Sequence, residues 1–140
     1  MITVLMLIAL LGLADAAYLL GKRYGPYRGP LVCPFNQTCD LVLESRYGRL
    51  LGFRNEIIGL AYYLLVLALL AFAMAGSPLP IALFGLSDPL RIAFLISIPA
   101  FIVSLTLTAI QHFILRNYCS YCLFANLLNA LLFIGLALVR

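Results

Sequence analysis

Four long runs of hydrophobic residues alternate with shorter polar stretches along the chain, at about residues 3–20, 57–75, 92–110 and 120–139. A run of about 18 or more apolar residues is typical of a membrane-spanning helix. At about 1.5 Å of rise per residue, each run is long enough to cross a hydrocarbon layer of about 30 Å. The pattern therefore predicts an all-α membrane protein built as a bundle of four transmembrane helices.

The polar stretches between these runs place all four cysteines on one side of the membrane. Four spans put both termini on one side, together with the Gly- and Pro-rich connection 76–88. The long loop 21–56, which carries Cys33 and Cys39, lies on the other side. The short connection 112–118 lies on that side too, directly before Cys119 and Cys122. Exchange between the two cysteine pairs is therefore geometrically possible.

The loop 21–56 is expected to contain a short surface helix. Gly and Pro residues make its first part irregular, whereas residues 40–46 can form a helix with Asp40 as its N-cap. The apolar residues 41–43 would lie on the membrane surface and cover the ends of the spans. Gly48 and Gly52 then interrupt the chain before the second span.

The composition agrees with a single integral membrane domain over residues 1–140. The chain is 65% hydrophobic and only 10% charged, with a mean hydropathy of +1.11, whereas soluble domains have about 25% charged residues. The first run lacks the basic segment of a signal peptide, so we expect it to remain as a span. The net charge of +4 is not concentrated in a basic tract, which does not favour nucleic-acid binding.

The last span carries a polar stripe. Cys119, Cys122, Asn126 and Asn129 follow the i, i+3, i+7, i+10 spacing of one helix face. Polar side chains in a span normally face the bundle interior, so we expect a polar pocket near one end of the bundle, under the cysteine-bearing loop. The other spans contribute polar or small residues to this interior: Asp15, Asn55, Gly59, Tyr62, Tyr63, Ser97, Ser104, Thr108 and Gln111.

Asp15 is costly inside a span if it is ionised, by about 2.5–3.5 kcal/mol at the centre of a helix. It lies near the loop end of the first hydrophobic run. Two interpretations are equally open: a role in the pocket, or packing at the end of the helix beside interfacial water.

The Cys119–Cys122 pair has the C-x-x-C spacing of redox-active thiols. A helix N-terminus lowers the pKa of a thiol, and so small a ring gives little entropic stabilisation, which argues against a purely structural disulfide. Cys33 and Cys39 alone would be an ordinary loop disulfide, but beside the other pair they become a candidate shuttle, mobile and accessible to a partner. A four-cysteine zinc site is the less favoured alternative, because the ligand spacing differs from the usual short knuckles. We therefore expect no metal.

Several motifs together resemble the vitamin K epoxide reductase family and its microbial disulfide-forming members, and we expect an archaeal homologue. They are Cys33-x₅-Cys39, the run 45–48 (Ser-Arg-Tyr-Gly), Gly52-x-x-Asn55-x-x-x-Gly59, Cys119-x-x-Cys122, and the segments 12–15 and 18–19 of the first span. The resemblance covers nearly the whole chain, and it is the joint spacing that is specific.

The resemblance implies a role for each matching residue. Cys119 and Cys122 match the active-site pair, with Cys122 facing a quinone. Cys33 and Cys39 match the loop shuttle pair, with Cys39 exchanging with Cys119. Ser45 matches a loop serine beside the active site, and Asn55 matches an asparagine that hydrogen-bonds the quinone in vertebrate members.

The expected function is a membrane thiol oxidoreductase. It would form disulfides in a thioredoxin-like partner, acting in trans because no such domain is fused to the chain, and would pass the electrons to a membrane quinone of the ubiquinone or menaquinone type. We expect Ser45, Asn55, Tyr62 and Asn126 to contact that quinone. Asn126 stands where vertebrate enzymes have a tyrosine, which disfavours the alternative of a quinone epoxide reductase. A non-catalytic membrane scaffold with structural disulfides is the alternative of another class.

The charges favour a cytoplasmic location for the cysteine side. Seven of the nine basic residues lie on that side: Lys22, Arg23, Arg28, Arg46, Arg49, Arg54 and Arg116. Positive charge prefers the cytoplasm, although most relatives place these cysteines outside, which remains the alternative. Disulfide formation in the cytosol fits a hyperthermophile, whose intracellular proteins can be rich in disulfides.

Overall fold

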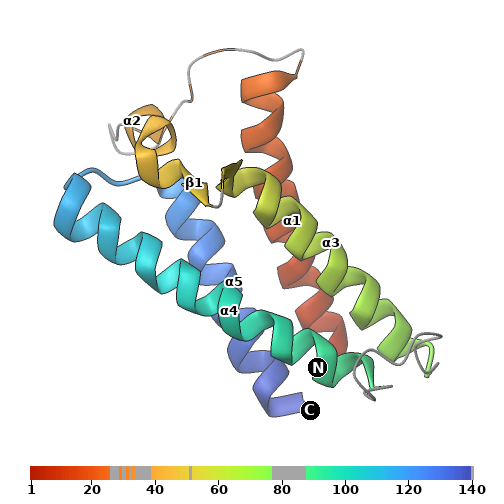
Figure 1. Cartoon of the computed structure of the whole chain (residues 1–140). Coiled ribbons are helices and arrows are strands. Elements are labelled where there is room, and N and C mark those ends of the chain that lie inside the picture. The colour runs from red at the N-terminus through yellow and green to blue at the C-terminus, as the bar shows by residue number, and fades with distance from the viewer. Residues whose placement is uncertain are drawn as a thin grey trace.

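Four long helices form the fold. The computed structural model describes residues 1–25, 29, 31, 33, 39–50, 52–76 and 88–139. Its long helices are α1 (Ile2–Tyr24), α3 (Asn55–Met74), α4 (Pro89–Ala109) and α5 (Ser120–Val139). Each is long and apolar enough to cross a membrane, α4 together with the segment that continues it. Both termini lie at the same end of the bundle (Figure 1). The predicted four-helix membrane fold is confirmed.

Small elements cover the end of the bundle opposite the termini (Figure 1). They are α2 (Cys39–Glu44), the 3₁₀ turn η2 (Arg46–Gly48), and the strands β1 (Arg49–Leu50) and β2 (Phe53–Arg54). The two strands form an antiparallel hairpin in which Arg49 pairs with Arg54. The sequence did not predict this hairpin, although Gly52 supplies the positive φ of +85° in its turn.

The short helix α2 was predicted with the wrong bounds. It begins at Cys39, so Asp40 lies within its first turn, and it ends at Glu44 instead of continuing to residue 46. The reason lies at Ser45, which has extended backbone angles (φ −61°, ψ 160°). The Ser45 hydroxyl donates a hydrogen bond to the Val42 carbonyl (2.7 Å), which satisfies a group left free at the helix end.

Two spans are longer than predicted. The helix α1 continues to Tyr24, well beyond the expected end at residue 20. The helix α4 continues as a π-helical segment, η3 (Ile110–Leu115), which ends at Arg116 in the left-handed conformation (φ 49°). Residues 112–115 are therefore helical, not part of a loop as predicted. The helix α4 begins at Pro89, before the expected start at residue 92, because Asp88 caps it: the Asp88 carboxylate accepts a hydrogen bond from the Leu90 N–H (3.0 Å).

The core holds α1, α3 and α5 closely together. Tyr63 of α3 is buried in the main apolar cluster, with Val66, Leu70 and Leu132. Its ring lies directly against Gly12 of α1, where a Cβ atom would overlap it. The Tyr63 hydroxyl donates to the carbonyl oxygen of Ala125 on α5 (2.9 Å). This one side chain therefore fixes three helices around the space described next.

Candidate functional site

All four cysteines come together at the loop end of the bundle. Cys33 and Cys39 form a disulfide, whereas Cys119 and Cys122 are free thiols. Cys39 and Cys119 belong to one buried cluster with Leu19, Val42 and Leu43, and Cys33 and Cys122 pack against it. The structure thus joins two pairs that lie some eighty residues apart in the sequence.

The two halves of the Cys33–Cys39 disulfide differ in exposure. Cys39 is 1% exposed and is held at the start of α2, whereas Cys33 is only partly buried. The sequence predicted a mobile, accessible disulfide, but Cys39 is buried and Cys33 is only partly exposed. Residues 34–38, between the two cysteines, lie outside the described part of the chain.

Cys119 occupies the N-cap position of α5. The Cys122 N–H points at the Cys119 Sγ (3.3 Å), and the Leu123 N–H donates to the Cys119 carbonyl (2.9 Å). The first of these contacts repeats the geometry of a side-chain N-cap, with sulfur in place of oxygen. The backbone N–H of Cys119 itself donates to Gln111 Oε1 in η3 (3.1 Å). Gln111 is 3% exposed, and the sequence had indicated it only as one of the polar residues that the other spans contribute to the interior.

These contacts favour the thiolate form of Cys119. The pKa of this thiol is lowered, first because the Cys122 side chain hydrogen-bonds to its sulfur and also because the N–H groups of Cys122 and Tyr121 point at it. Burial acts in the opposite direction. The sequence predicted that a helix N-terminus stabilises a thiolate of this pair, and in the structure the N–H groups at this terminus point at Cys119.

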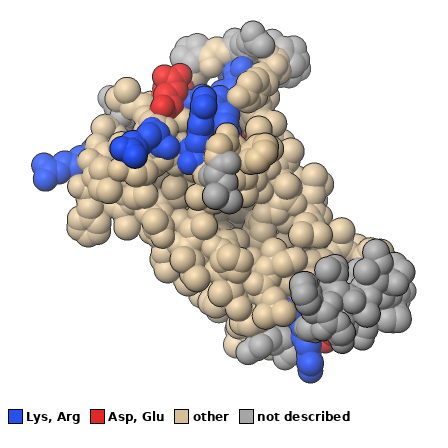
Figure 2. All heavy atoms as spheres, in the orientation of Figure 1, with Lys and Arg blue, Asp and Glu red and all other residues tan. Residues whose placement is uncertain are grey.

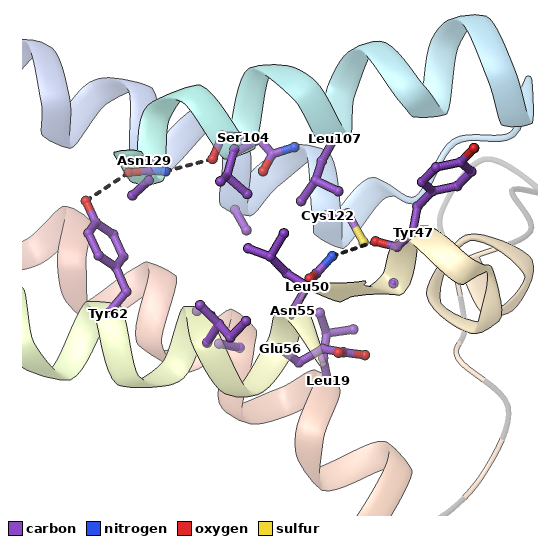
Figure 3. Close-up of a pocket in the computed structure, with 18 of the residues that line it drawn as sticks. Leu19, Tyr47, Leu50, Asn55, Glu56, Tyr62, Ser104, Leu107, Cys122 and Asn129 are labelled. Carbon is purple, nitrogen blue, oxygen red and sulfur yellow. Dashed lines mark hydrogen bonds between the residues drawn. The ribbon is translucent and has the colours of Figure 1, made fainter. Parts of the chain in front are cut away.

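A cavity of about 520 Å³ lies between the four long helices, beneath α2 and the hairpin (Figure 3). Cavities of roughly 300–1,000 Å³ with mostly apolar walls are typical of small-molecule sites. Apolar side chains form most of the wall here. The polar or ionisable residues that line it are Asp15, Ser45, Tyr47, Asn55, Glu56, Tyr62, Tyr63, Ser104, Gln111, Cys122, Asn126 and Asn129. The cavity thus includes every residue predicted to contact a quinone.

Three of the four residues in the predicted polar stripe of the last span line this cavity, namely Cys122, Asn126 and Asn129, and the two asparagines bond to α4. Asn126 Nδ2 donates to Thr108 Oγ1 (2.9 Å), and Asn129 Nδ2 donates to Ser104 Oγ (2.7 Å). The Tyr62 hydroxyl donates to Asn129 Oδ1 (2.8 Å), which adds α3 to the network. The view in Figure 3 places Tyr62 and Asn129 at one end of the cavity and Cys122 at the other.

Asn55 and Ser45 lie at the cysteine end of the cavity. Asn55 Nδ2 donates to the Tyr47 carbonyl (2.9 Å), which ties the start of α3 to η2. Asn55 Oδ1 is buried and has no hydrogen-bond partner among the described residues. Ser45 lines the cavity, but its hydroxyl already donates to the Val42 carbonyl.

Sequence reasoning missed a buried ion pair at the cavity wall. Glu56 is 6% exposed, and its Oε1 lies 3.7 Å from Arg23 Nε. The Arg23 side chain is itself mostly buried. An acidic residue beside Asn55, directly before the predicted span 57–75, was the available signal, because a charge next to a span needs a partner.

The zinc alternative finds no support in this arrangement. The Cys33–Cys39 disulfide removes two of the four thiolates that such a site would require. Within the described ranges, no group of three His, Cys, Asp or Glu side chains is arranged to hold a metal ion.

Comparison with known proteins agrees with the resemblance seen in the motifs. The profile of the vitamin K epoxide reductase family matches residues 3–136. A search among curated proteins found no match. Because the family match covers nearly the whole sequence, the chain belongs to the vitamin K epoxide reductase family, whose members are oxidoreductases that use quinones.

Proposed function

We propose that this protein oxidises the dithiol of a thioredoxin-like partner and passes the electrons to a membrane quinone of the ubiquinone or menaquinone type. The partner acts in trans, and the electrons move through Cys33 and Cys39 to Cys119 and Cys122. One observation carries this proposal: the four cysteines pack in one cluster, and Cys122 of that cluster also lines the cavity.

The exposures of the cysteines support a direction of transfer. A partner thiolate attacks Cys33, the more exposed sulfur of the disulfide, and Cys39 leaves as the thiolate. Cys39 is buried in the same cluster as Cys119 and attacks it, which frees Cys122. The partner's second thiol attacks the mixed disulfide, which forms the partner's own disulfide and releases Cys33. Cys33 then displaces Cys119 from Cys39, so that the loop disulfide forms again and Cys119 leaves as the thiolate. The structure has the redox state that follows this exchange, with a Cys33–Cys39 disulfide and two thiols.

The cavity suits a quinone ring. Such a ring is flat and largely apolar, with two carbonyl oxygens that accept hydrogen bonds, and when bound it can accept two electrons and two protons. Each side-chain amide nitrogen carries two N–H groups. One N–H of Asn55 and one of Asn126 are used in the bonds described above. The second N–H of each amide is the donor we assign to the quinone carbonyls, with Tyr62 and Ser45 shaping the two ends of the cavity.

We also propose that the cysteine side faces the cytoplasm. The described basic residues Lys22, Arg23, Arg46, Arg49, Arg54 and Arg116 belong to this end, whereas Arg91 belongs to the end with the termini. Figure 2 shows several blue side chains gathered at one end of the molecule and one at the other. Arg28 and Arg140 lie outside the described residues. This asymmetry is the pattern of a cytoplasmic face.

The proposal is tested with purified protein, a reduced thioredoxin-like partner and a short-chain quinone, with hydroquinone formation as the measurement. The wild-type protein should form hydroquinone, and Cys119→Ala and Cys122→Ala should each reduce the rate to background. Cys33→Ala and Cys39→Ala should lose turnover with the protein partner but keep it with a small dithiol, because a small reductant does not need the shuttle pair.

Folded wild-type protein that forms no hydroquinone would contradict the proposal. Turnover of a quinone epoxide by the same preparation would favour the epoxide reductase alternative. Cysteine variants that lose no activity in cells would favour the structural scaffold.

A further inference from the structure

Asp15 lies deep inside the bundle and faces the cavity. Because α1 continues to Tyr24, Asp15 is nine residues from the end of the helix, or roughly 13 Å along its axis. It is 9% exposed, and it lines the same cavity as Cys122. The interpretation of Asp15 as a residue packed at the helix end is therefore wrong, and the pocket interpretation stands.

The Asp15 carboxyl is buried like that of Glu56, but it lacks an ion-pair partner such as the Arg23 side chain beside Glu56. Asp15 Oδ2 has no hydrogen-bond partner among the described residues. The ion pairs found in the described part of the chain join Arg23 to Glu56 and Arg91 to Asp88, and neither includes Asp15. A carboxylate beside a guanidinium remains ionised, whereas a buried carboxyl with no cation can hold a proton. Ionisable residues kept inside a span at such a cost are normally functional.

Asp15 is within electrostatic reach of both active-site thiols. The titratable groups that it influences are Tyr63 on α3, Tyr121 and Cys122 on α5, and Cys119 directly before α5. The other charged groups on the elements around it are Glu56 on α3, and Lys22 and Arg23 on α1 itself. Asp15 is thus the only cavity-lining carboxyl in the described residues that has no cation within ion-pair distance.

The proposed reaction needs a proton at a defined place. With Cys119 as thiolate and Cys122 as thiol, formation of their S–S bond releases two electrons and the Cys122 proton. Reduction of the quinone to hydroquinone takes up those two electrons and two protons. One of the two protons can therefore come from Cys122, and the other must enter from water. Transfer inside an apolar cavity needs a group that can both give and accept a proton.

We propose that Asp15 is this group: it donates its proton to one quinone oxygen and takes up the proton that Cys122 releases as the disulfide forms. Asp15 is unchanged by a complete cycle, and the second quinone oxygen receives the proton from water. This inference rests on the proposed quinone reduction and adds a residue and a proton path to it. Glu56, which lies beside Arg23, has no part in this transfer.

The first test does not depend on activity. The infrared spectrum of the reduced protein without quinone, at neutral pH, should contain the absorption of a protonated carboxyl group. Asp15→Asn should remove this band, whereas Glu56→Gln and Asp40→Asn, an exposed acid on α2, should retain it. Labelling the protein with isotope-substituted aspartate should shift the band even in the wild type. A band that is absent, or that does not shift, would overturn the inference whether or not Asp15→Asn folds.

The second test measures a single turnover. Protein reduced at Cys119 and Cys122 is mixed with a short-chain quinone, and the rate of hydroquinone formation is followed against pH. General acid catalysis typically contributes about 100-fold or more, so Asp15→Asn should be slower by about that factor. Its pH profile should lose the part that depends on Asp15 and keep the part set by the Cys119 and Cys122 thiols. Asp15→Glu should recover much of the rate, and Asp40→Asn should match the wild type.

The two proposals fail in different ways in this experiment. Wild-type protein that forms no hydroquinone contradicts the proposed function and the Asp15 inference with it. Active wild-type protein together with an Asp15→Asn variant of equal rate and unchanged pH profile contradicts the inference alone. An Asp15→Glu variant as slow as Asp15→Asn would also count against it, because an acid would then be present without effect.

Discussion

Cys119 and Cys122 are three residues apart, yet they have different surroundings. Cys119 is fully buried among Leu19, Cys39 and Leu43, and the first N–H groups of α5 point at its sulfur. Cys122 is partly buried, one turn along the helix, and lines the cavity. A single motif therefore has one thiol toward the Cys33–Cys39 pair and one toward the cavity, as the proposed relay requires.

The pH at which Cys119 ionises tests this difference. The pKa of Cys119 is lowered, mainly because the Cys122 side chain hydrogen-bonds to its sulfur. The Cys119 thiolate should therefore form below the pKa of an ordinary cysteine, about 8.5. Cys122→Ala removes that hydrogen bond, so the midpoint should move to higher pH. The measurement is the ultraviolet absorbance of the thiolate, with Cys33 and Cys39 oxidised and Cys119→Ala as the blank. An unchanged midpoint in Cys122→Ala would show that the helix N-terminus alone sets the pKa.

At the scale of elements, close approach of α1 and α3 forms one wall of the cavity. The two helices meet where Gly12 leaves room for the ring of Tyr63, whose hydroxyl is held by the Ala125 carbonyl on α5. On the other side, η3 places Gln111 against the first residue of the C-x-x-C motif. π-Helical segments are often found at functional sites, and this one fixes the N-terminus of α5.

Substitution of Gly12 should disturb this wall. In Gly12→Ala the new methyl group overlaps the Tyr63 ring, which is tethered at its hydroxyl, so we expect a loss of about 1–3 kcal/mol in the free energy of unfolding. Gly21→Ala, in the same helix, is the matched control: nothing lies within 4 Å of its Cβ position, and alanine is the better helix former, so this variant should be neutral or slightly stabilised. Thermal unfolding in detergent measures both. Equal melting temperatures for the two variants would contradict the tight packing at Gly12.

At the scale of the whole molecule, the two ends of the bundle are different in kind. One end has the termini, and the other has the cysteine cluster, α2, the hairpin and most of the described basic residues (Figures 1 and 2). The cavity lies beneath the cysteine end and within the span region. The proposed function would therefore bring a thiol partner to the aqueous side of this end and a lipid-soluble quinone to the cavity beneath it.

The orientation is tested by labelling single cysteines in intact cells. In a background without native cysteines, Glu44→Cys places an exposed thiol on the cysteine side, and Ala75→Cys places one on the terminal side. Neither change removes a positive charge. An impermeant thiol reagent should label Ala75→Cys from outside, and should label Glu44→Cys only after the membrane is permeabilised. The reverse pattern would contradict a cytoplasmic cysteine face.

The sequence by itself determined the four spans, the common side of the cysteines and the inward face of the last helix. Each of these follows from local properties: the length of an apolar run, the parity of the spans, and the 3.6-residue period that aligns Cys122 with Asn126 and Asn129. Even so, helix ends such as Tyr24 and Leu115 were missed, because capping and π-helical turns leave little trace in hydropathy.

Only the tertiary structure decided which groups meet. The burial of Cys39 against Cys119, the hydrogen bond from Cys119 to Gln111 and the pairing of Arg23 with Glu56 all join segments that are separate in the sequence. Asp15 shows the physical reason most clearly. Whether an acid in a span is solvated at a helix end or enclosed in a cavity depends on the helices packed around it, and the sequence of its own helix does not contain that information.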